Sequence, residues 1–91
     1  MDTGRQFKLG RIFMTPGIAE SLDQSEVLHA LRRHSRGDWG DVSEEDRKEN
    51  ELSLNKAMRL FSVYHSSKGQ KFWIITEANR SYTTVLLPEE Y

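Results

Sequence analysis

The chain has 91 residues, which fits one small domain and excludes a two-domain enzyme with separate cofactor and substrate halves. Its formal net charge of −1 leaves no basic excess for non-specific binding to DNA or RNA, and the absence of cysteine excludes disulfides, thiolate metal sites and cysteine nucleophiles. No apolar run is long enough to span a membrane, and residues 1–10 hold no apolar signal core, so we expect a cytoplasmic protein without a membrane segment.

The first predicted element is a β-strand over residues 7–14, where apolar residues alternate loosely. Residues 1–6 before it are polar, and we expect them to be flexible. The strand ends at Pro16, which cannot donate to a β-ladder, and at Gly17, which frees the backbone. The remaining elements follow closely enough to predict a single α+β domain over residues 7–91.

A helix is predicted next, over residues 24–36. Asp23 is a suitable N-cap, Glu26 is its capping-box partner three residues on, and Gly37 is a natural residue to end the helix. Its expected apolar stripe consists of Val27, Leu28 and Leu31.

Ser43 is the expected N-cap of a further helix, whose first turn is acidic. Apolar residues recur three, four and seven positions apart near its end, which predicts a face packed on the core. These residues are Leu54, Ala57, Met58 and Phe61.

The last third of the chain predicts three strands, over residues 60–66, 71–76 and 82–87. Short loops between them are typical of an antiparallel meander. The strand containing Phe72-Trp73-Ile74-Ile75 is apolar on both faces and should therefore be central. The expected fold is a two-layer α+β domain in the order strand, helix, helix, strand, strand, strand, with both helices on one face of an antiparallel sheet.

A loop with a tryptophan separates the two helices, and it offers a possible binding surface. Trp39 either plugs the edge of the core or contacts a partner. The other candidate binding residues are Arg36, Asp38 and Arg80. The two arginines are candidates because arginine recognises phosphates and carboxylates well. Their alternative roles are solvated charges and loop caps.

His34 lies at the edge of the predicted apolar stripe and is either a half-buried structural histidine or a general acid–base. In a metal-independent ribonuclease, Arg59 or Arg80 would stabilise phosphate charge and Thr84 would orient the substrate. The three histidines lack metal-ligand spacing, so we predict neither a metal site nor a cofactor.

Residues 33–40, 60–64 and 72–91 together resemble an uncharacterised family of short bacterial proteins described as plasmid-related or hypothetical. The most specific part is the ending, with Ile75-Thr76-Glu77-Ala78, Arg80 and residues 83–88. The order of elements also bears a distant likeness to the barnase–colicin–RelE group of small ribonucleases. That likeness implies roles for His34, for Arg59 or Lys71, and for Thr83 or Thr84.

Three functions are therefore expected, in decreasing order of support. The first is a non-enzymatic module of the bacterial cytoplasm, associated with mobile DNA, that binds an unidentified protein partner. The second is the ribonuclease. The third is nucleic-acid binding without catalysis, through Arg32, Arg33, Arg36 and Trp39.

Overall fold

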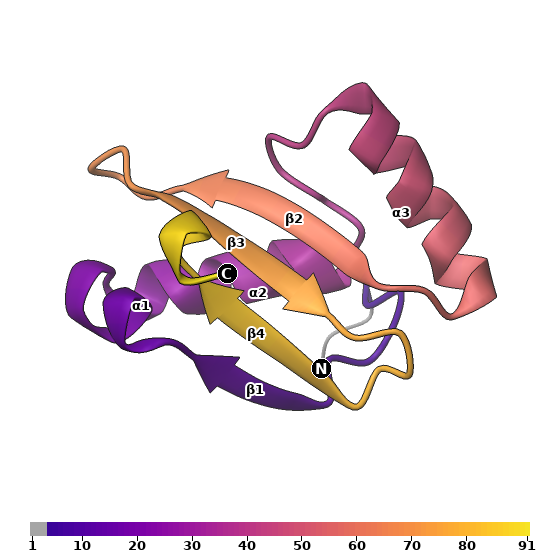
Figure 1. Cartoon of the computed structure of the whole chain (residues 1–91), viewed down its shortest axis with the longest axis horizontal. Helices are drawn as coiled ribbons and strands as arrows, with labels where there is room; N and C mark the ends of the chain where they lie inside the picture. The colour runs from indigo at the N-terminus through magenta and orange to yellow at the C-terminus, as the bar shows by residue number, and fades with distance from the viewer. Residues whose placement is uncertain (1–3) are drawn as a thin grey trace.

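The computed structural model describes residues 4–91 and shows three α-helices beside a four-stranded sheet (Figure 1). The elements in chain order are β1 (Arg11–Met14), α1 (Pro16–Ser21), α2 (Gln24–Ser35), α3 (Glu44–Lys56), β2 (Leu60–His65), β3 (Lys71–Thr76), β4 (Tyr82–Leu86) and the short 3-10 helix η1 (Pro88–Glu90). The α+β class is thus confirmed. The first three residues lie outside the described part of the chain, and so does half of the stretch predicted to be flexible.

The sheet has the strand order β1-β4-β3-β2, so β3 is central between β2 and β4, as predicted. These three strands form the antiparallel meander. The prediction of a fully antiparallel sheet is wrong, because β1 pairs with β4 in parallel. The two strands are far apart in the chain, and a sequence pattern does not encode the direction of such a pairing.

The first strand is also shorter than predicted, because the chain turns at Gly10. The φ angle there is +69°, and a side chain would lie 2.3 Å from the carbonyl oxygen of Ser81. Phe7 therefore leaves the sheet and packs edge-on against the ring of His34. The backbone N–H of Gln6 donates to the carbonyl of Ser35, which holds this preceding segment beside the end of α2.

Helix α2 covers one face of the sheet and lies behind it in Figure 1. The core that it closes consists of Ile18, Val27, Ala30, Leu31, Tyr64, Phe72, Ile74, Val85 and Leu87. The predicted stripe is wrong at Leu28, whose side chain is 58% exposed. Ala30 and His34 occupy the buried face in its place.

Helix α3 does not share that face, so the prediction that both helices cover one face is correct only for α2. It runs beside β2, at the edge of the sheet (Figure 1). The predicted apolar stripe fails because the helix ends at Lys56, and Ala57 adopts a left-handed conformation with φ 50°. Met58 is consequently exposed, while the buried residues of α3 are Asn50 and Ser53.

The backbone of β2 is capped along its outer edge. The side-chain amide of Asn50 donates to the carbonyl of Phe61 at 2.7 Å, and its oxygen accepts from the Phe61 N–H at 3.0 Å. Two residues further on, Val63 donates to the carbonyl of Trp39 and accepts from the N–H of Asp41. These contacts satisfy the groups that a bare edge strand would offer to another chain.

Candidate functional site

The four side chains predicted for a ribonuclease do not share a site. His34 lies on α2, faces the sheet and is fully buried. Thr84 belongs to the other face of the sheet, because its neighbour Thr83 contacts the His34 side and residues alternate along a strand. Arg59 also lies on the face opposite His34, next to Phe61 and Trp73.

Arg80 occupies the turn before β4 and is used as a structural clamp. Its guanidinium donates to four carbonyl oxygens, those of Ser53, Met58, Glu77 and Ala78. Two of these belong to the end of α3 and the residues after it, so Arg80 ties α3 to the β3–β4 turn. These bonds occupy both Nη1 hydrogens and one Nη2 hydrogen, so the guanidinium cannot present its full fork to a phosphate.

His34 is the centre of a buried chain of hydrogen bonds that crosses three strands. Its Nδ1 lies 2.5 Å from the hydroxyl of Ser62 on β2, and its Nε2 lies 2.9 Å from the hydroxyl of Thr76 on β3. The Thr76 and Thr83 hydroxyls are 2.7 Å apart, and Thr83 donates to the carbonyl of Leu9 at 2.7 Å. Within residues 4–91, every buried side-chain nitrogen or oxygen has a hydrogen-bond partner.

The direction of this chain follows from its far end. A carbonyl has no proton, so the single hydroxyl proton of Thr83 is directed to Leu9. Thr76 must then donate to Thr83, and the Nε2–H of His34 must donate to Thr76. The Nδ1 of His34 is left as an acceptor for the hydroxyl proton of Ser62, which assigns a single neutral tautomer.

The surroundings of His34 keep it neutral. Burial, together with the positive charge of Arg80, lowers the pKa of His34 to about 3. The rings of Phe7 and Trp39 pack edge-on against the imidazole at 5.2 and 5.6 Å between centroids. The imidazole is thus a component of the core, and it has no path to a substrate in this conformation.

The depressed pKa of His34 predicts that stability falls as the solution becomes more acidic. Between about pH 6.5, the usual histidine value, and about pH 3, the unfolded chain binds one proton more than the folded chain at this residue. Stability is therefore fully present above pH 6.5, and the free energy of unfolding should drop by about 2 kcal/mol between pH 7 and pH 5. Denaturant titrations at the two pH values would measure this difference.

NMR of the histidine side chains assigns the effect to its residue. The His34 resonance should keep the shifts of the neutral Nε2–H tautomer at pH 5, and His29→Gln, an exposed change on the same helix, should keep the same dependence of stability on pH. Protonation of His34 near pH 6.5 would contradict both its burial and its hydrogen-bond assignment.

Trp39 is buried, so the ring is not available to a partner. Its side chain is 3% exposed, stacks on Phe7 at 6.1 Å between centroids and donates its indole N–H to Glu51 at 3.0 Å. The following Gly40 has a φ of +72°, and a side chain on it would lie 2.0 Å from the carbonyl oxygen of Val63. The Trp39 loop is therefore a plug that lies against β2.

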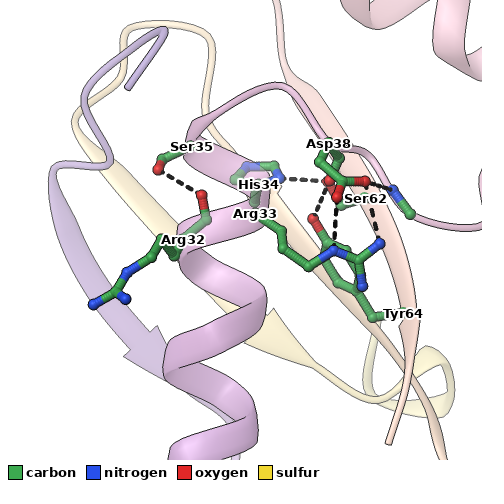
Figure 2. A network of polar contacts seen from close by, with 8 residues as sticks. Arg32, Arg33, His34, Ser35, Asp38, Ser62 and Tyr64 are labelled. Carbon is green, nitrogen blue, oxygen red and sulfur yellow. Dashed lines mark hydrogen bonds and ion pairs between the residues drawn. The ribbon is translucent and has the colours of Figure 1, made fainter. Parts of the chain in front are cut away.

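Asp38 is also a structural residue. Its carboxylate accepts from Arg33 at 2.8 and 3.2 Å, and this pairing holds the pKa of Asp38 below its usual value (Figure 2). The Arg33 guanidinium lies 4.8 Å from the centre of the Tyr64 ring, and the Tyr64 hydroxyl donates to the carbonyl of Asp38. Of the predicted binding residues at this end of α2, Arg36 and Asp38 are exposed, and Trp39 is buried.

Of the helices in residues 4–91, the short η1 is the one that lies on the face of the sheet opposite α2, in front of the sheet in Figure 1. Aromatic side chains gather there in a row, with Phe61 against Trp73 at 5.1 Å and Trp73 against Tyr91 at 5.8 Å between centroids. They line a hollow of about 380 Å³, which we call the trough. Its lining residues are Asp46, Arg59, Phe61, Trp73, Ile75 and Tyr91.

The trough continues toward α3 in a second hollow of about 410 Å³. The two hollows share Asp46, Arg59 and Phe61, and the second adds Glu49. Arg59 is already engaged, since it donates to the Tyr91 hydroxyl at 3.2 Å and pairs with Glu77 at 3.4 Å. Asp46 and Glu49 form no ion pair with any residue of the range 4–91, so the free charge along the trough is negative.

Sequence reasoning named Arg59 but missed the aromatic residues of the trough as functional candidates. The signal was present in the alternation along residues 71–76, which places Trp73 and Ile75 opposite Phe72 and Ile74. The missing fact was the location of α3. Because both helices were expected on the other face of the sheet, the sequence did not indicate that α3 borders Trp73 and Phe61.

No group of three or more histidine, aspartate or glutamate side chains within residues 4–91 is placed to hold a metal ion. No helix in the same range is both long and apolar enough to cross a membrane. Comparisons with protein-family models, with curated proteins and with solved structures found no match to this chain.

Proposed function

We propose that the protein is a non-enzymatic interaction module that binds a partner protein in the trough. The observation that supports this role is the row of aromatic rings on the uncovered face of the sheet, bordered by carboxylates without partners. Aromatic side chains in a hollow are the groups that most often dominate binding energy at protein interfaces.

The chemistry of the trough favours one kind of partner. Phe61, Trp73 and Ile75 form an apolar floor that fits one large aliphatic or aromatic side chain. Asp46 and Glu49 lie beside this floor and attract a cation, while Arg59 is neutralised by Glu77. The partner segment should therefore carry an apolar anchor next to lysine or arginine.

The contacts of the other candidate residues favour binding over catalysis. His34 is neutral and enclosed, and Arg80 is occupied by backbone carbonyls. A general acid–base must reach the proton that it transfers. The cytoplasmic location and the association with bacterial mobile DNA stay predictions.

A peptide-display selection against the purified protein tests the proposal. Selected sequences should share an apolar residue adjacent to a basic one. NMR titration of the labelled protein with such a peptide should then shift the resonances of Arg59, Phe61, Trp73 and Tyr91. Tyr91→Ala removes a wall that is 71% exposed, so we expect an affinity loss of about tenfold without loss of the fold.

Tyr82→Ala is the matched control, since Tyr82 lies on β4 outside the trough and packs against Phe13. It should bind the peptide as the wild type does. The proposal is wrong if the selected peptides shift residues around His34 or Arg36 and leave the trough unchanged. If the protein cleaved RNA and His34→Ala abolished that cleavage, the ribonuclease function would replace the proposed binding function.

A further inference from the structure

The two edges of the sheet are treated differently. The outer edge of β2 is capped by Asn50 and by the Trp39–Asp41 segment. Among residues 4–91 no segment covers the outer edge of β1, which lies at the lower border of the sheet in Figure 1. An uncovered edge strand is a template for pairing with another chain.

The backbone groups that β1 leaves open can be identified. Arg11 and Thr15 direct their N–H groups to Ser81 and Val85 of the β4 side. Because alternate residues of a strand face opposite neighbours, Ile12 and Met14 direct their N–H and carbonyl groups outward. All four residues of β1 are exposed, with Ile12, Phe13 and Met14 at 44, 45 and 43%.

Only one antiparallel register of β1 with a second β1 uses both open residues of each copy. It pairs Ile12 with Met14 of the second copy and places the two Phe13 residues opposite each other on the symmetry axis. A shift in one direction would require Gly10, which is not extended at φ +69°. A shift in the other direction would require Pro16, which has no N–H to donate.

This register also matches opposite charges. It sets Arg11 beside Thr15 of the second copy. The Thr15 hydroxyl donates a hydrogen bond to the carboxylate of Glu90. The Glu90 carboxylate is held in place by the N–H groups of Gly17 at 2.9 Å and Leu87 at 3.0 Å. Arg11 lies over the Phe13 ring, at 5.5 Å from its centroid, and pairs with no carboxylate within residues 4–91.

We propose that the occupant of the β1 edge is a second copy of this chain, which pairs antiparallel with it through Ile12 and Met14 to form a continuous eight-stranded sheet. The two-fold axis passes between the Phe13 rings, and an Arg11–Glu90 pair forms on each side of it. Apolar side chains meet on both faces, because Phe13 and Ile12 belong to opposite faces of the strand. On the α2 side, Ile12 lies beside the exposed Leu28. The trough is two strands away and stays accessible in this dimer.

Cysteine cross-linking tests the register directly, because the chain has no cysteine of its own. Opposite residues of a non-hydrogen-bonded antiparallel pair have Cα atoms about 4.5 Å apart, which a disulfide can bridge. Phe13→Cys should therefore oxidise to a covalent dimer. Ile12→Cys is the matched control, equally exposed, and its diagonal neighbour is about 7–8 Å away, so it should react roughly tenfold more slowly.

Sedimentation across a concentration series tests the interaction without a cross-link. Arg11→Glu should raise the dissociation constant about tenfold, because it replaces two attractive pairs with two repulsive ones. Lys68→Glu, the same charge change in the β2–β3 hairpin, should leave the constant unchanged. Met14→Pro removes an outward N–H that an edge strand can spare, so the variant should fold and stay monomeric.

Two results would overturn the proposal. One is a wild-type chain that stays monomeric up to about 1 mM, where even a weak dimer would form. The other is a dimer in which Ile12→Cys cross-links as fast as Phe13→Cys, or which Arg11→Glu and Met14→Pro do not weaken.

Discussion

Ile74→Ala should lower the free energy of unfolding by about 3–4 kcal/mol, within the range measured for buried isoleucine. Ile74 is fully buried in the core cluster, and its neighbours across the sheet are Ser62 on β2 and Val85 on β4. Removing the side chain loses its transfer free energy and leaves a cavity that strands on both sides prevent from collapsing. Chemical denaturation followed by circular dichroism would measure the change in midpoint.

Ile75→Ala is the comparison that makes the Ile74 result specific. Ile75 is adjacent in β3 but belongs to the opposite face, beside the trough. The trough is open to solvent, so part of the lost volume can be filled by water and the cost should be about half as large. If Ile74→Ala were no more destabilising than Ile75→Ala, the placement of the main core under α2 would be wrong.

His34→Leu should destabilise the protein by about 3 kcal/mol, although leucine is apolar and close in size. The substitution removes the acceptor of the Ser62 hydroxyl and the donor to Thr76, both of which are fully buried. A buried polar group without a partner costs more than the net value of the bond that it lost. The free energy of unfolding at pH 7 is the measurement.

A second substitution separates loss of the network from loss of packing. In His34→Leu/Ser62→Ala the orphaned hydroxyl is gone, so the double variant should be more stable than the sum of the single effects implies. His29→Leu, an exposed change on the same helix, should be close to neutral. Strict additivity of His34→Leu and Ser62→Ala would contradict a shared hydrogen bond.

The buried chain of hydrogen bonds and the trough lie on opposite faces of the sheet. On the α2 side, polar groups are fully paired, and the residues that resemble catalytic ones, His34 and Thr83, serve the fold. On the other side, aromatic rings line a hollow, and the carboxylates of Asp46 and Glu49 form no ion pair within residues 4–91. Residue type alone did not show that His34 would be enclosed in this way.

Several parts of this fold were readable from local patterns. The cap Ser43 and the three apolar strands at the end of the chain lie where the sequence predicts them. Helix α2 also begins after Asp23, but the predicted capping box is wrong, because Asp23 makes no side-chain cap bond and the Glu26 carboxylate accepts from Ser67. The unbroken apolar run from Phe72 to Ile75 correctly identified the central strand. These features depend on neighbouring residues in the chain or on how many faces of a strand are buried. Both produce a recognisable pattern of apolar and polar residues in the sequence.

Other features depended on contacts between residues far apart in the chain. The apolar spacing near the end of α3 predicted a core face, but Asn50 bonds the backbone of Phe61 and Arg80 holds the carbonyls of Ser53 and Met58. These bonds place the helix at the edge of the sheet. A polar side chain that satisfies a strand edge has the same appearance in a sequence as one that faces water.

The sequence by itself determined the fold class, the meander, the central position of β3 and the start of α3, because each follows from short-range periodicity or from the Ser43 cap. The tertiary structure alone decided the parallel pairing of β1, the position of α3, the enclosure of His34 and Trp39, and the trough. The physical reason is that hydrogen bonds and van der Waals contacts between distant segments select one of several arrangements that share the same local pattern. Phe61 packs against Trp73 and Trp73 against Tyr91, so three aromatic positions that are far apart in the sequence form one surface only after the strands have paired.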